Sequence, residues 1–237
     1  MIELSKLTIR AHAGRLKLWF KILKNVNGTS VKVQLGLIFS AIIDTFFCLV
    51  CPSRVSSFKV YVSGVVYIKN YNVYFFLRKF SDDILHVLPG MELDVHDLIL
   101  GLLEENDTFV DVGANVGYYS ILASRIVGEK GQVISIEPYP STAEVLGLNV
   151  RINNLRNIRL VPKVAWSKKS TISMHVPTGH YGWATTYGKW RESESCSVEA
   201  MPLDAICEEV ASVKLLKIDV EGSEYQVLRG ARETLKK

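Results

Sequence analysis

The chain has 237 residues, of which 48% are hydrophobic, and its formal net charge is +4 at pH 7. This length suits one α/β domain with an extension, and the apolar content argues against a disordered chain. The net charge is too small to indicate a nucleic-acid-binding protein, and it is concentrated in residues 1–32, which hold seven lysines and arginines against one acid.

Residues 7–26 predict a helix with two faces. Basic side chains recur along one face and large apolar side chains along the other. This pattern is typical of a helix on an anionic membrane surface, and equally of a solvated basic stripe over a packed face, so both interpretations stay open. The basic residues are Arg10, Lys17, Lys21 and Lys24, and the apolar residues are Leu16, Trp19, Phe20 and Leu23.

Residues 35–51 form an apolar run that is interrupted by Asp44. The run is at the lower length limit for a membrane-spanning helix, and a central aspartate raises the free energy of insertion by about 2.5–3.5 kcal/mol. We therefore expect a buried or interfacial helix in preference to a span, ending at Pro52. We interpret Cys48 and Cys51 as small apolar residues, with a redox or metal pair as the alternative, because no convincing zinc set surrounds them in the sequence.

Residues 58–68 and 72–79 are rich in Val, Tyr and Phe, and the segment 70–72 between them predicts a hairpin turn. From residue 109 onward, apolar strands alternate with helical patterns, which predicts a parallel sheet with helical crossovers. The strands are expected at about 109–112, 132–136, 158–162 and 213–218, with a β-type excursion at 170–175 and 196–201. We expect two domains: a basic, apolar helical extension at 1–55 and an α/β domain at 56–237.

The most informative motif is DTFVDVGANVGYYS at residues 107–120. It predicts a strand, a tight turn with two glycines and the start of a helix. Glycines let the backbone come close to a ligand, and the free N–H groups of the helix N-terminus face it. The next predicted strand ends in Glu137, where an acid can accept hydrogen bonds from a ribose. Together these features indicate a cofactor that contains a nucleoside.

The turn also discriminates between cofactors. A dinucleotide site with the pattern G-x-G-x-x-G would need glycines where Asn115 and Tyr118 stand. Asp111 in the preceding strand would repel a pyrophosphate but would suit a cationic ligand. S-adenosylmethionine carries a sulfonium, an ammonium and a ribose, and no phosphate. It is therefore favoured over NAD, and a turn that binds no ligand is the remaining alternative.

Several segments resemble the FkbM-type S-adenosylmethionine-dependent methyltransferases, in the family's usual order and over about residues 90–237. The resemblance implies a Rossmann-like, doubly wound, mostly parallel sheet, S-adenosylmethionine as the cofactor, and O-methylation of a hydroxyl on a sugar, glycolipid or secondary metabolite. The acceptor is a small molecule or glycan that the sequence does not identify. The matching segments are VDVGANVGYYS (110–120), ISIEPYP (134–140), the pair 148–149, VAWS (164–167), the triplet 202–204 and LLKIDVEGSEYQVLRGA (215–231).

Glu137 is the residue expected to hold the ribose hydroxyls, with a solvated acid at a strand end as the alternative. Charge-assisted hydrogen bonds of this kind contribute roughly 1.5–3 kcal/mol each. Gly113, Ala114 and Gly117 are expected to give the cofactor access to the backbone.

The amino-acid part of the cofactor is expected to contact Asp111 and Asn115, directly or through water. Tyr139 is expected beside the ribose or adenine. The family's adenine slot falls at Val164 and Ala165, for which a place in the hydrophobic core is an equal alternative.

Asp219 and Glu221 follow the fourth strand at the edge of the sheet where such folds bind ligands. If the strand persists, their spacing puts both carboxylates on one side, and mutual repulsion would raise one pKa. They are candidates for the catalytic base; two ligands for a hard cation are an alternative, although no metal is predicted. Asp219 contacting the cofactor and Glu221 capping the next helix is the plainer alternative. His180, in a polar, aromatic loop at 179–190 that suits a sugar, is a third catalytic candidate.

The doubly wound fold has the strand order 3-2-1-4-5-7-6, and this sequence ends at Lys237, after the fourth strand and its helix. The fourth strand is therefore expected at an edge. The sequence is a fragment, a naturally short member of the family, or a chain whose edge is covered by its own hairpin or by a partner such as a second copy in a homo-oligomer. The alternative to an enzyme is a non-catalytic, shortened cofactor-binding or scaffolding module at a membrane. No secretory signal is recognisable, so we expect a cytoplasmic protein, with peripheral contact to anionic membrane through residues 1–55.

Overall fold

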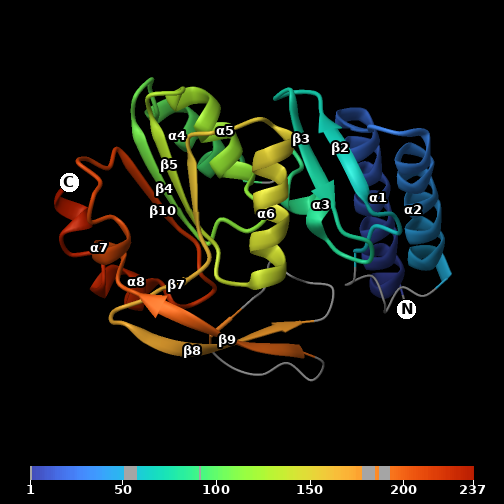
Figure 1. The fold of residues 1–237 in the computed structure, drawn as a ribbon. Coiled ribbons are helices and arrows are strands. Elements are labelled where there is room, and N and C mark those ends of the chain that lie inside the picture. The colour runs from blue at the N-terminus through green and yellow to red at the C-terminus, as the bar shows by residue number, and fades with distance from the viewer. Residues whose placement is uncertain (1, 51–57, 91, 178–184, 187–192) are drawn as a thin grey trace. The chain divides into compact units, whose positions relative to one another are not determined.

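The computed structural model describes residues 2–50, 58–90, 92–177, 185–186 and 193–237, with side chains for all of these except 2–12 and 49. It divides the chain into two compact units, Met1–Met91 and Glu92–Lys237 (Figure 1).

The N-terminal unit combines two long helices with a small antiparallel sheet of order β1-β2-β3. Strands β2 and β3 form the expected hairpin, with Val66 opposite Phe75 and with Asn72 in the left-handed conformation (φ +55°) that such turns need. The elements are α1 (Ile2–Asn25), β1 (Val26–Gly28), α2 (Val31–Val50), β2 (Gly64–Ile68), β3 (Val73–Leu77) and α3 (Asp83–His86).

The hairpin belongs to the N-terminal unit, whereas the sequence placed the domain boundary at residue 55. The reason lies in β1, a strand of three residues between the two long helices. It pairs with β2, with Val26 opposite Ile68, and so joins the hairpin to α1 and α2. The boundary between the two units consequently falls between Met91 and Glu92 in the sequence.

Helix α2 confirms the helix expected over the apolar run. Its first turn is capped by Ser30, whose Oγ accepts the N–H of Val33. Residues Val31–Cys48 are long and apolar enough to cross a membrane, and 33% of that segment is buried. Cys48 is buried, as expected for a small apolar residue; Cys51 and Pro52 lie outside the described residues.

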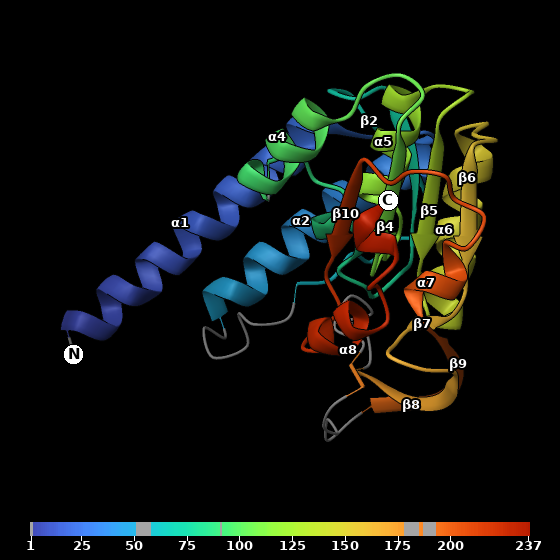
Figure 2. The ribbon, with the colours of Figure 1, turned by 90° about the vertical axis from the view of Figure 1, so that its left-hand side faces the viewer.

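The C-terminal unit contains a parallel sheet of order β10-β4-β5-β6, which is the expected order 4-1-2-3 of the first four strands (Figure 2). A second sheet of order β7-β9-β8 confirms the expected β-type excursion. The elements are α4 (Leu93–Leu102), β4 (Thr108–Val112), α5 (Tyr118–Val127), β5 (Gln132–Ile136), α6 (Pro140–Ile152), β6 (Ile158–Val161), β7 (Val164–Ala165), β8 (Ser170–Pro177), β9 (Ser193–Met201), α7 (Leu203–Ile206), β10 (Leu215–Ile218), α8 (Glu224–Arg229) and a 3₁₀ turn at Thr234–Lys236.

Apolar residues cover both faces of the parallel sheet, as the near-continuous apolar strands require. Val110 and Ile134 face one core, which includes Leu203 and Val227 from α7 and α8. The alternate residue Phe109 faces the other core, with residues of α4 and α5. Within the described residues β10 pairs with β4 alone, so it occupies an edge as expected.

Candidate functional site

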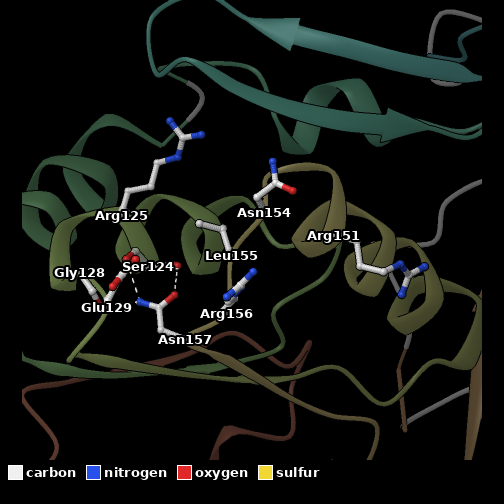
Figure 3. Close-up of a pocket in the computed structure, with 9 residues that line it drawn as sticks. All are labelled: Ser124, Arg125, Gly128, Glu129, Arg151, Asn154, Leu155, Arg156 and Asn157. Atoms are coloured by element: carbon white, nitrogen blue, oxygen red, sulfur yellow. Dashed lines mark hydrogen bonds between the residues drawn. The ribbon is translucent and has the colours of Figure 1, made fainter.

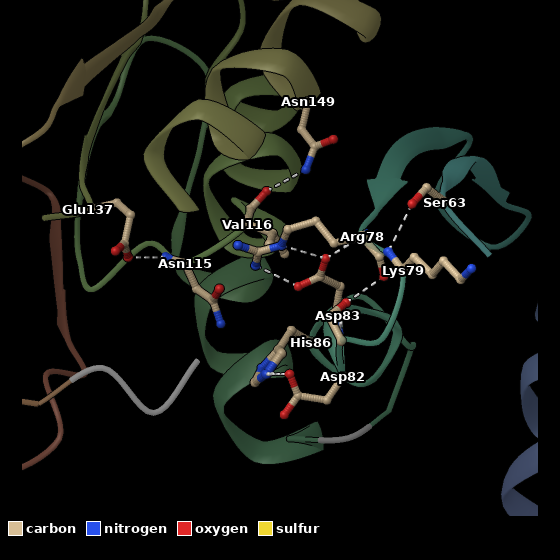
Figure 4. Close-up of polar contacts among 11 residues, drawn as sticks. Ser63, Arg78, Lys79, Asp82, Asp83, His86, Asn115, Val116, Glu137 and Asn149 are labelled. Atoms are coloured by element: carbon tan, nitrogen blue, oxygen red, sulfur yellow. Dashed lines mark hydrogen bonds and ion pairs between the residues drawn. The ribbon is translucent and has the colours of Figure 1, made fainter. Parts of the chain in front are cut away.

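The turn between β4 and α5 is fixed by hydrogen bonds to its neighbours. The N–H groups of Gly113 and Ala114 both donate to the carbonyl of Ile136, at 2.9 and 3.0 Å, so the turn is joined to the end of β5. Asn149 of α6 is fully buried and donates from Nδ2 to the carbonyl of Val116 at 2.8 Å (Figure 4). The turn is thus a rigid part of the fold.

The two glycines of this turn are needed for packing against neighbouring segments of the unit. Gly113 and Gly117 have φ values of +78° and +92°, which glycine adopts most readily. A Cβ atom at Gly113 would collide with the backbone oxygen of Asp219, and one at Gly117 would collide with the side chain of Leu146. In the structure these glycines let the loop after β10 and helix α6 approach the turn. The expectation that they also give a ligand access to the backbone stays a prediction.

Glu137 follows β5, is 6% exposed, and is held by two backbone groups. Its Oε2 accepts the N–H of Asn115 at 2.9 Å (Figure 4). Its Oε1 accepts the N–H of Tyr139, also at 2.9 Å. A carboxylate has about four acceptor positions, so hydroxyl groups can bind to Glu137 in addition to these amides. The carboxylate and the glycine turn therefore form one assembly.

Asn115 takes part in this assembly with an unusual backbone. Its φ of +49° lies in the left-handed region, which asparagine tolerates better than most residues. Its side-chain Oδ1 is buried and has no hydrogen-bond partner within the part of the chain that the structure describes. A buried acceptor of this kind is a position where a ligand donor such as an ammonium would be stabilised.

Asp111 is almost completely buried, at 1% exposure, beneath the turn. The Nζ of Lys217 lies 3.2 Å from Asp111 Oδ1, and the Ser120 hydroxyl donates to Oδ2 at 2.7 Å. Ser135 in turn donates to Ser120 at 2.7 Å. Since Lys217, Asp111 and Ser135 stand at matching register on adjacent strands, the network runs across the sheet on one face.

Burial and charge together set the proton affinities in this network. Burial by itself would lower the pKa of Lys217, but the carboxylates of Asp111 and Asp219 outweigh it and raise the pKa. Burial raises the pKa of Tyr119 strongly, and the hydrogen bond from its hydroxyl to Glu92 Oε2, at 2.8 Å, adds to the increase. Lys217 therefore carries a firmly held positive charge, and Tyr119 remains neutral.

Sequence reasoning missed Lys217, Tyr119 and Ser120. One signal was available for Lys217, because it is the single cation within the apolar run LLKI. Asp219 stands two positions further along the chain. A charged residue inside a central-type strand needs a buried partner, and Asp111 of the neighbouring strand is that partner. Periodicity alone gives no such signal for Tyr119 and Ser120, which lie in the first turn of α5.

Asp219 and Glu221 would lie on one side of the sheet only if strand β10 continued through both residues, and it does not. The strand ends at Ile218, and Glu221 has a left-handed backbone (φ +50°), so Asp219 and Glu221 do not continue the strand. The Asp219 side chain is 58% exposed, with Oδ2 3.6 Å from the Nζ of Lys217. Among the described residues no group of three acidic, histidine or cysteine side chains is arranged to hold a metal ion.

The carboxylate that serves the N-terminus of α8 is Glu224, whereas the sequence had suggested Glu221. Its Oε1 accepts the N–H of Gly222 at 3.2 Å and of Val220 at 3.4 Å. Backbone N–H groups, its own first, hold the pKa of Glu224 below its ordinary value. Glu221 is thus not needed as the cap.

Tyr139, Val164 and Ala165 are all buried. Tyr139 donates from its hydroxyl to Glu194 Oε2 on β9, at 2.6 Å. Val164 and Ala165 form β7 and belong to two hydrophobic clusters, so both take part in the core. Their proposed place at an adenine slot stays a prediction.

His180 and most of the aromatic loop lie outside the described residues. Thr185 and Thr186, from the middle of that loop, contact the segment after β10. The Thr185 hydroxyl donates to the carbonyl of Glu221 at 3.4 Å, and the Thr186 hydroxyl lies 2.7 Å from that of Ser223. These contacts connect the loop with the carboxyl edge of the sheet.

A separate open depression of about 1060 Å³ lies at the opposite edge of the sheet (Figure 3). Its residues precede β5 and β6, whereas the residues of the turn and Glu137 follow strands. Arg125 and Arg151 stand in the last turns of α5 and α6, where cations compensate the helix dipoles, so we do not assign the cofactor here. The lining residues are Ser124, Arg125, Gly128, Glu129, Arg151, Asn154, Leu155, Arg156 and Asn157.

Comparison with protein families identifies a Methyltransferase FkbM domain over residues 111–237, which is more than half of the chain. The matched region contains the turn, Glu137 and the loop after β10. It therefore covers the whole assembly of Glu137 and the glycine turn, and the buried network around Lys217 and Tyr119 except for Glu92.

Curated relatives are also methyltransferases. The 2-O-methyltransferase NoeI of Sinorhizobium fredii is 29% identical over 68% of this chain and 72% of that protein. The hexuronic acid methyltransferase AglP of Haloferax volcanii is 28% identical over 61% of this chain and 58% of that protein. The chain spans less than two thirds of the length of most curated relatives it matches. A solved protein-L-isoaspartate O-methyltransferase aligns at 28% identity over 31% of this chain and 23% of that chain, with a TM-score of 0.28.

Proposed function

Because this chain belongs to the FkbM methyltransferase family, for which S-adenosylmethionine is the implied cofactor, we propose that it methylates a hydroxyl group of a sugar or glycolipid. The printed names of two relatives support the acceptor class, since one is a 2-O-methyltransferase and the other acts on a hexuronic acid. A secondary metabolite with a similar hydroxyl is the nearest alternative acceptor.

The observation that carries the proposal is the coupling of Glu137 to the glycine turn. The N–H of Asn115 fixes one oxygen of the Glu137 carboxylate at the end of β5, beside the turn that ends β4. Neighbouring strand ends in this position form the ligand crevice of doubly wound sheets. Glu137 would hold the ribose hydroxyls there, and the buried Oδ1 of Asn115 would accept from the ammonium group.

Asp111 has a supporting role in this proposal. Its carboxylate already contacts Lys217 and Ser120, so it positions the strand end and the turn above it. The carboxylate of Glu137 and the buried side-chain oxygen of Asn115 are acceptors that suit a ligand with hydroxyls and a positive charge. The cation near the turn, Lys217, is already paired with Asp111, so it does not favour a pyrophosphate. The residues present therefore fit S-adenosylmethionine better than a dinucleotide.

The bound cofactor supplies an electrophilic methyl group, and the protein must position the acceptor hydroxyl and remove its proton. Positioning alone can supply about 7–11 kcal/mol of the barrier reduction. Asp219 is our candidate base, because its exposed carboxylate follows β10 directly and its backbone oxygen adjoins Gly113. The charge of Lys217, 3.6 Å away, keeps Asp219 oriented toward the carboxyl edge. His180 and Glu221 stay as further candidates.

Two experiments test this function. Calorimetric titration should show binding of S-adenosylmethionine and none of NAD; the opposite result would exclude the proposed cofactor. Methyl transfer to a panel of sugars and glycolipids should then be lowered more by Asp219→Asn than cofactor affinity is, as expected for a group used in the transition state. Equal losses in the rate of methyl transfer and in cofactor affinity would show that Asp219 serves binding and not catalysis. Glu221→Gln, measured in parallel, tests the second carboxylate.

A non-catalytic cofactor-binding module is the second candidate function. The feature that favours it is β10, a largely apolar strand at the edge of the described sheet. Exposed edge strands are normally covered, and a protein partner could pair with this one. Cofactor binding without methyl transfer to any acceptor in the panel would support this alternative.

A further inference from the structure

Helix α2 presents two faces of opposite character. One row of residues, at helical spacing, packs into the N-terminal unit, and the row on the other side consists of large apolar side chains that are exposed. Large contiguous apolar surfaces are uncommon on soluble monomers and mark sites of interaction. The buried row is Val33, Leu37, Ser40, Asp44 and Cys48, and the exposed row is Leu35, Ile38, Phe39, Ile42, Phe46, Phe47 and Val50.

The single acid of this helix points into the protein. Asp44 accepts a hydrogen bond from Trp19 Nε1 at 2.7 Å, and its Oδ2 lies 3.2 Å from the Nε of Arg15, both on α1. The guanidinium of Arg15 also stacks over Phe58, 5.2 Å from the ring centre. The charge that interrupts the apolar run is therefore neutralised inside the unit, and between Val33 and Val50 the exposed face of α2 carries no charge.

The buried face cannot be released without dismantling the unit. The Ser40 hydroxyl accepts the N–H of Tyr61 at 2.9 Å. A Cβ atom at Gly36 would collide with Val62, and one at Gly64 would collide with Val33, so the helix and the strand segment are in direct contact. A transmembrane span would expose this polar, closely packed face to lipid. The structure thus favours a helix that stays packed on one side and contacts its partner with the other.

The charges of the neighbouring helix α1 and of residues 1–32 indicate the kind of partner. On α1, next to α2 in Figures 1 and 2, Lys17 and Lys24 are exposed together with Leu16 and Phe20. Residues 1–32 hold seven basic residues and one acid. Two copies of this surface would repel each other, whereas anionic lipid headgroups attract it through each basic residue near the surface.

We propose that the exposed row of α2 inserts into the interfacial layer of an anionic membrane, with the lysines of α1 among the headgroups. The helix lies in the plane of the membrane, because its polar face remains bound to the N-terminal unit. At 1.5 Å per residue, its 20 residues provide an apolar edge about 30 Å long. The proposal rests on the N-terminal unit alone, so it can fail or succeed independently of the methyltransferase assignment.

Flotation of the whole chain with liposomes tests the proposal. The vesicles contain phosphatidylcholine alone or phosphatidylcholine mixed with phosphatidylserine, at low and high salt. We expect flotation with the mixed vesicles at low salt, and release by high salt or alkaline carbonate. The double variant Ile42→Ser/Phe46→Ser should weaken partitioning about a hundredfold, because two large apolar side chains no longer leave water.

The matched control is Leu98→Ser/Leu102→Ser on α4, a pair with the same helical spacing. Leu98 is 57% exposed and Leu102 43%, compared with 62% for Ile42 and 56% for Phe46. The control should float like the natural chain. Equal losses in both double variants, or failure to float at low salt, would overturn the proposal. Retention after carbonate extraction would show a span instead, and concentration-dependent dimers abolished by Ile42→Ser/Phe46→Ser without lipid binding would show a second copy as the partner.

Discussion

Both compact units bury an aspartate, and the two environments differ in what they support. Asp44 lies within a helix and is held by Trp19 and Arg15 from a neighbouring helix. Asp111 lies near the end of a parallel strand, where Lys217 and Ser120 hold it directly beneath a glycine turn. The first carboxylate orients an amphipathic helix, and the second stabilises the edge of a sheet where we propose that the cofactor binds.

This difference shows that burial of an acid does not by itself mark a functional site. Both carboxylates are paired with a cation and hydrogen-bonded, as buried charges must be. What distinguishes Asp111 is its position near the carboxyl ends of parallel strands, on the strand beside β5, after which Glu137 follows. The topology of the sheet, and not the local chemistry of the pair, is the reason for proposing that Asp111 lies near a ligand.

The largest effect is expected from Lys217→Met in the C-terminal unit. Loss of the cation would leave the carboxylate of Asp111 charged and buried, which typically costs about 3–5 kcal/mol of folding free energy. Urea denaturation monitored by circular dichroism measures this loss. The control Lys236→Met removes a surface pair with Glu233 and should change stability by about 0–1 kcal/mol. A loss at Lys217 no larger than this control would mean that the buried network contributes little.

The second prediction concerns ligand binding at the edge of the sheet. Glu137→Ala should weaken S-adenosylmethionine binding by about 1.5–3 kcal/mol, because a charge-assisted acceptor of ribose hydroxyls is lost. Isothermal titration calorimetry on folded protein measures it. Glu129→Ala, in the depression at the opposite edge, is the control and should leave affinity unchanged. Unchanged affinity in Glu137→Ala would make the ribose assignment wrong.

The third prediction tests the other side of the comparison. Asp44→Asn should lower the stability of the chain by only about 1–2 kcal/mol. The amide oxygen can still accept from Trp19, and the long side chain of Arg15 can move its charge toward water. S-adenosylmethionine affinity should not change, because Asp44 serves the N-terminal unit. An affinity loss as large as that of Glu137→Ala would remove the distinction between the two acids.

Most of the fold could be predicted because apolar periodicity and turn residues report it directly. The strands at 109–112 and 132–136, the hairpin and the position of Glu137 follow from patterns of a few neighbouring residues. The family resemblance supplied the order of the strands in the sheet, which local patterns do not determine. Pairings between distant residues were harder to predict, and the ion pair between Lys217 and Asp111 is an example.

The faces of α2 show a second limit of sequence patterns. Both faces carry apolar residues, so periodicity alone cannot tell which one is buried, and the partners of Asp44 and Ser40 decide it. Strand β1 is too short to show any periodicity, yet it determines where the units divide. The end of β10 and the left-handed backbone of Glu221 likewise depend on the tertiary contacts of that loop.

The smallest expected effect is a dependence of stability on alkaline pH that belongs to the C-terminal network. Lys217 and Tyr119 both have a raised pKa in the folded chain, Lys217 because nearby carboxylates outweigh its burial and Tyr119 because of burial and its bond to Glu92. Both groups hold their proton more tightly when folded. Their contribution to stability is therefore fully present below the ordinary pKa values of 10.5 and 10.0 and is lost as the pH rises through the raised values.

Urea midpoints measured from pH 8 to 11 test this dependence. Each proton adds at most about 1.4 kcal/mol of destabilisation per pH unit above pH 10. Tyr119→Phe removes one of the two titrating groups, so the urea midpoint should fall less steeply with pH above pH 10. The control is Tyr225→Phe, which makes the same substitution at an exposed tyrosine. An unchanged slope in Tyr119→Phe would mean that Tyr119 binds its proton equally well in the unfolded chain. The buried network would then be held by the ion pair of Lys217 and Asp111 alone.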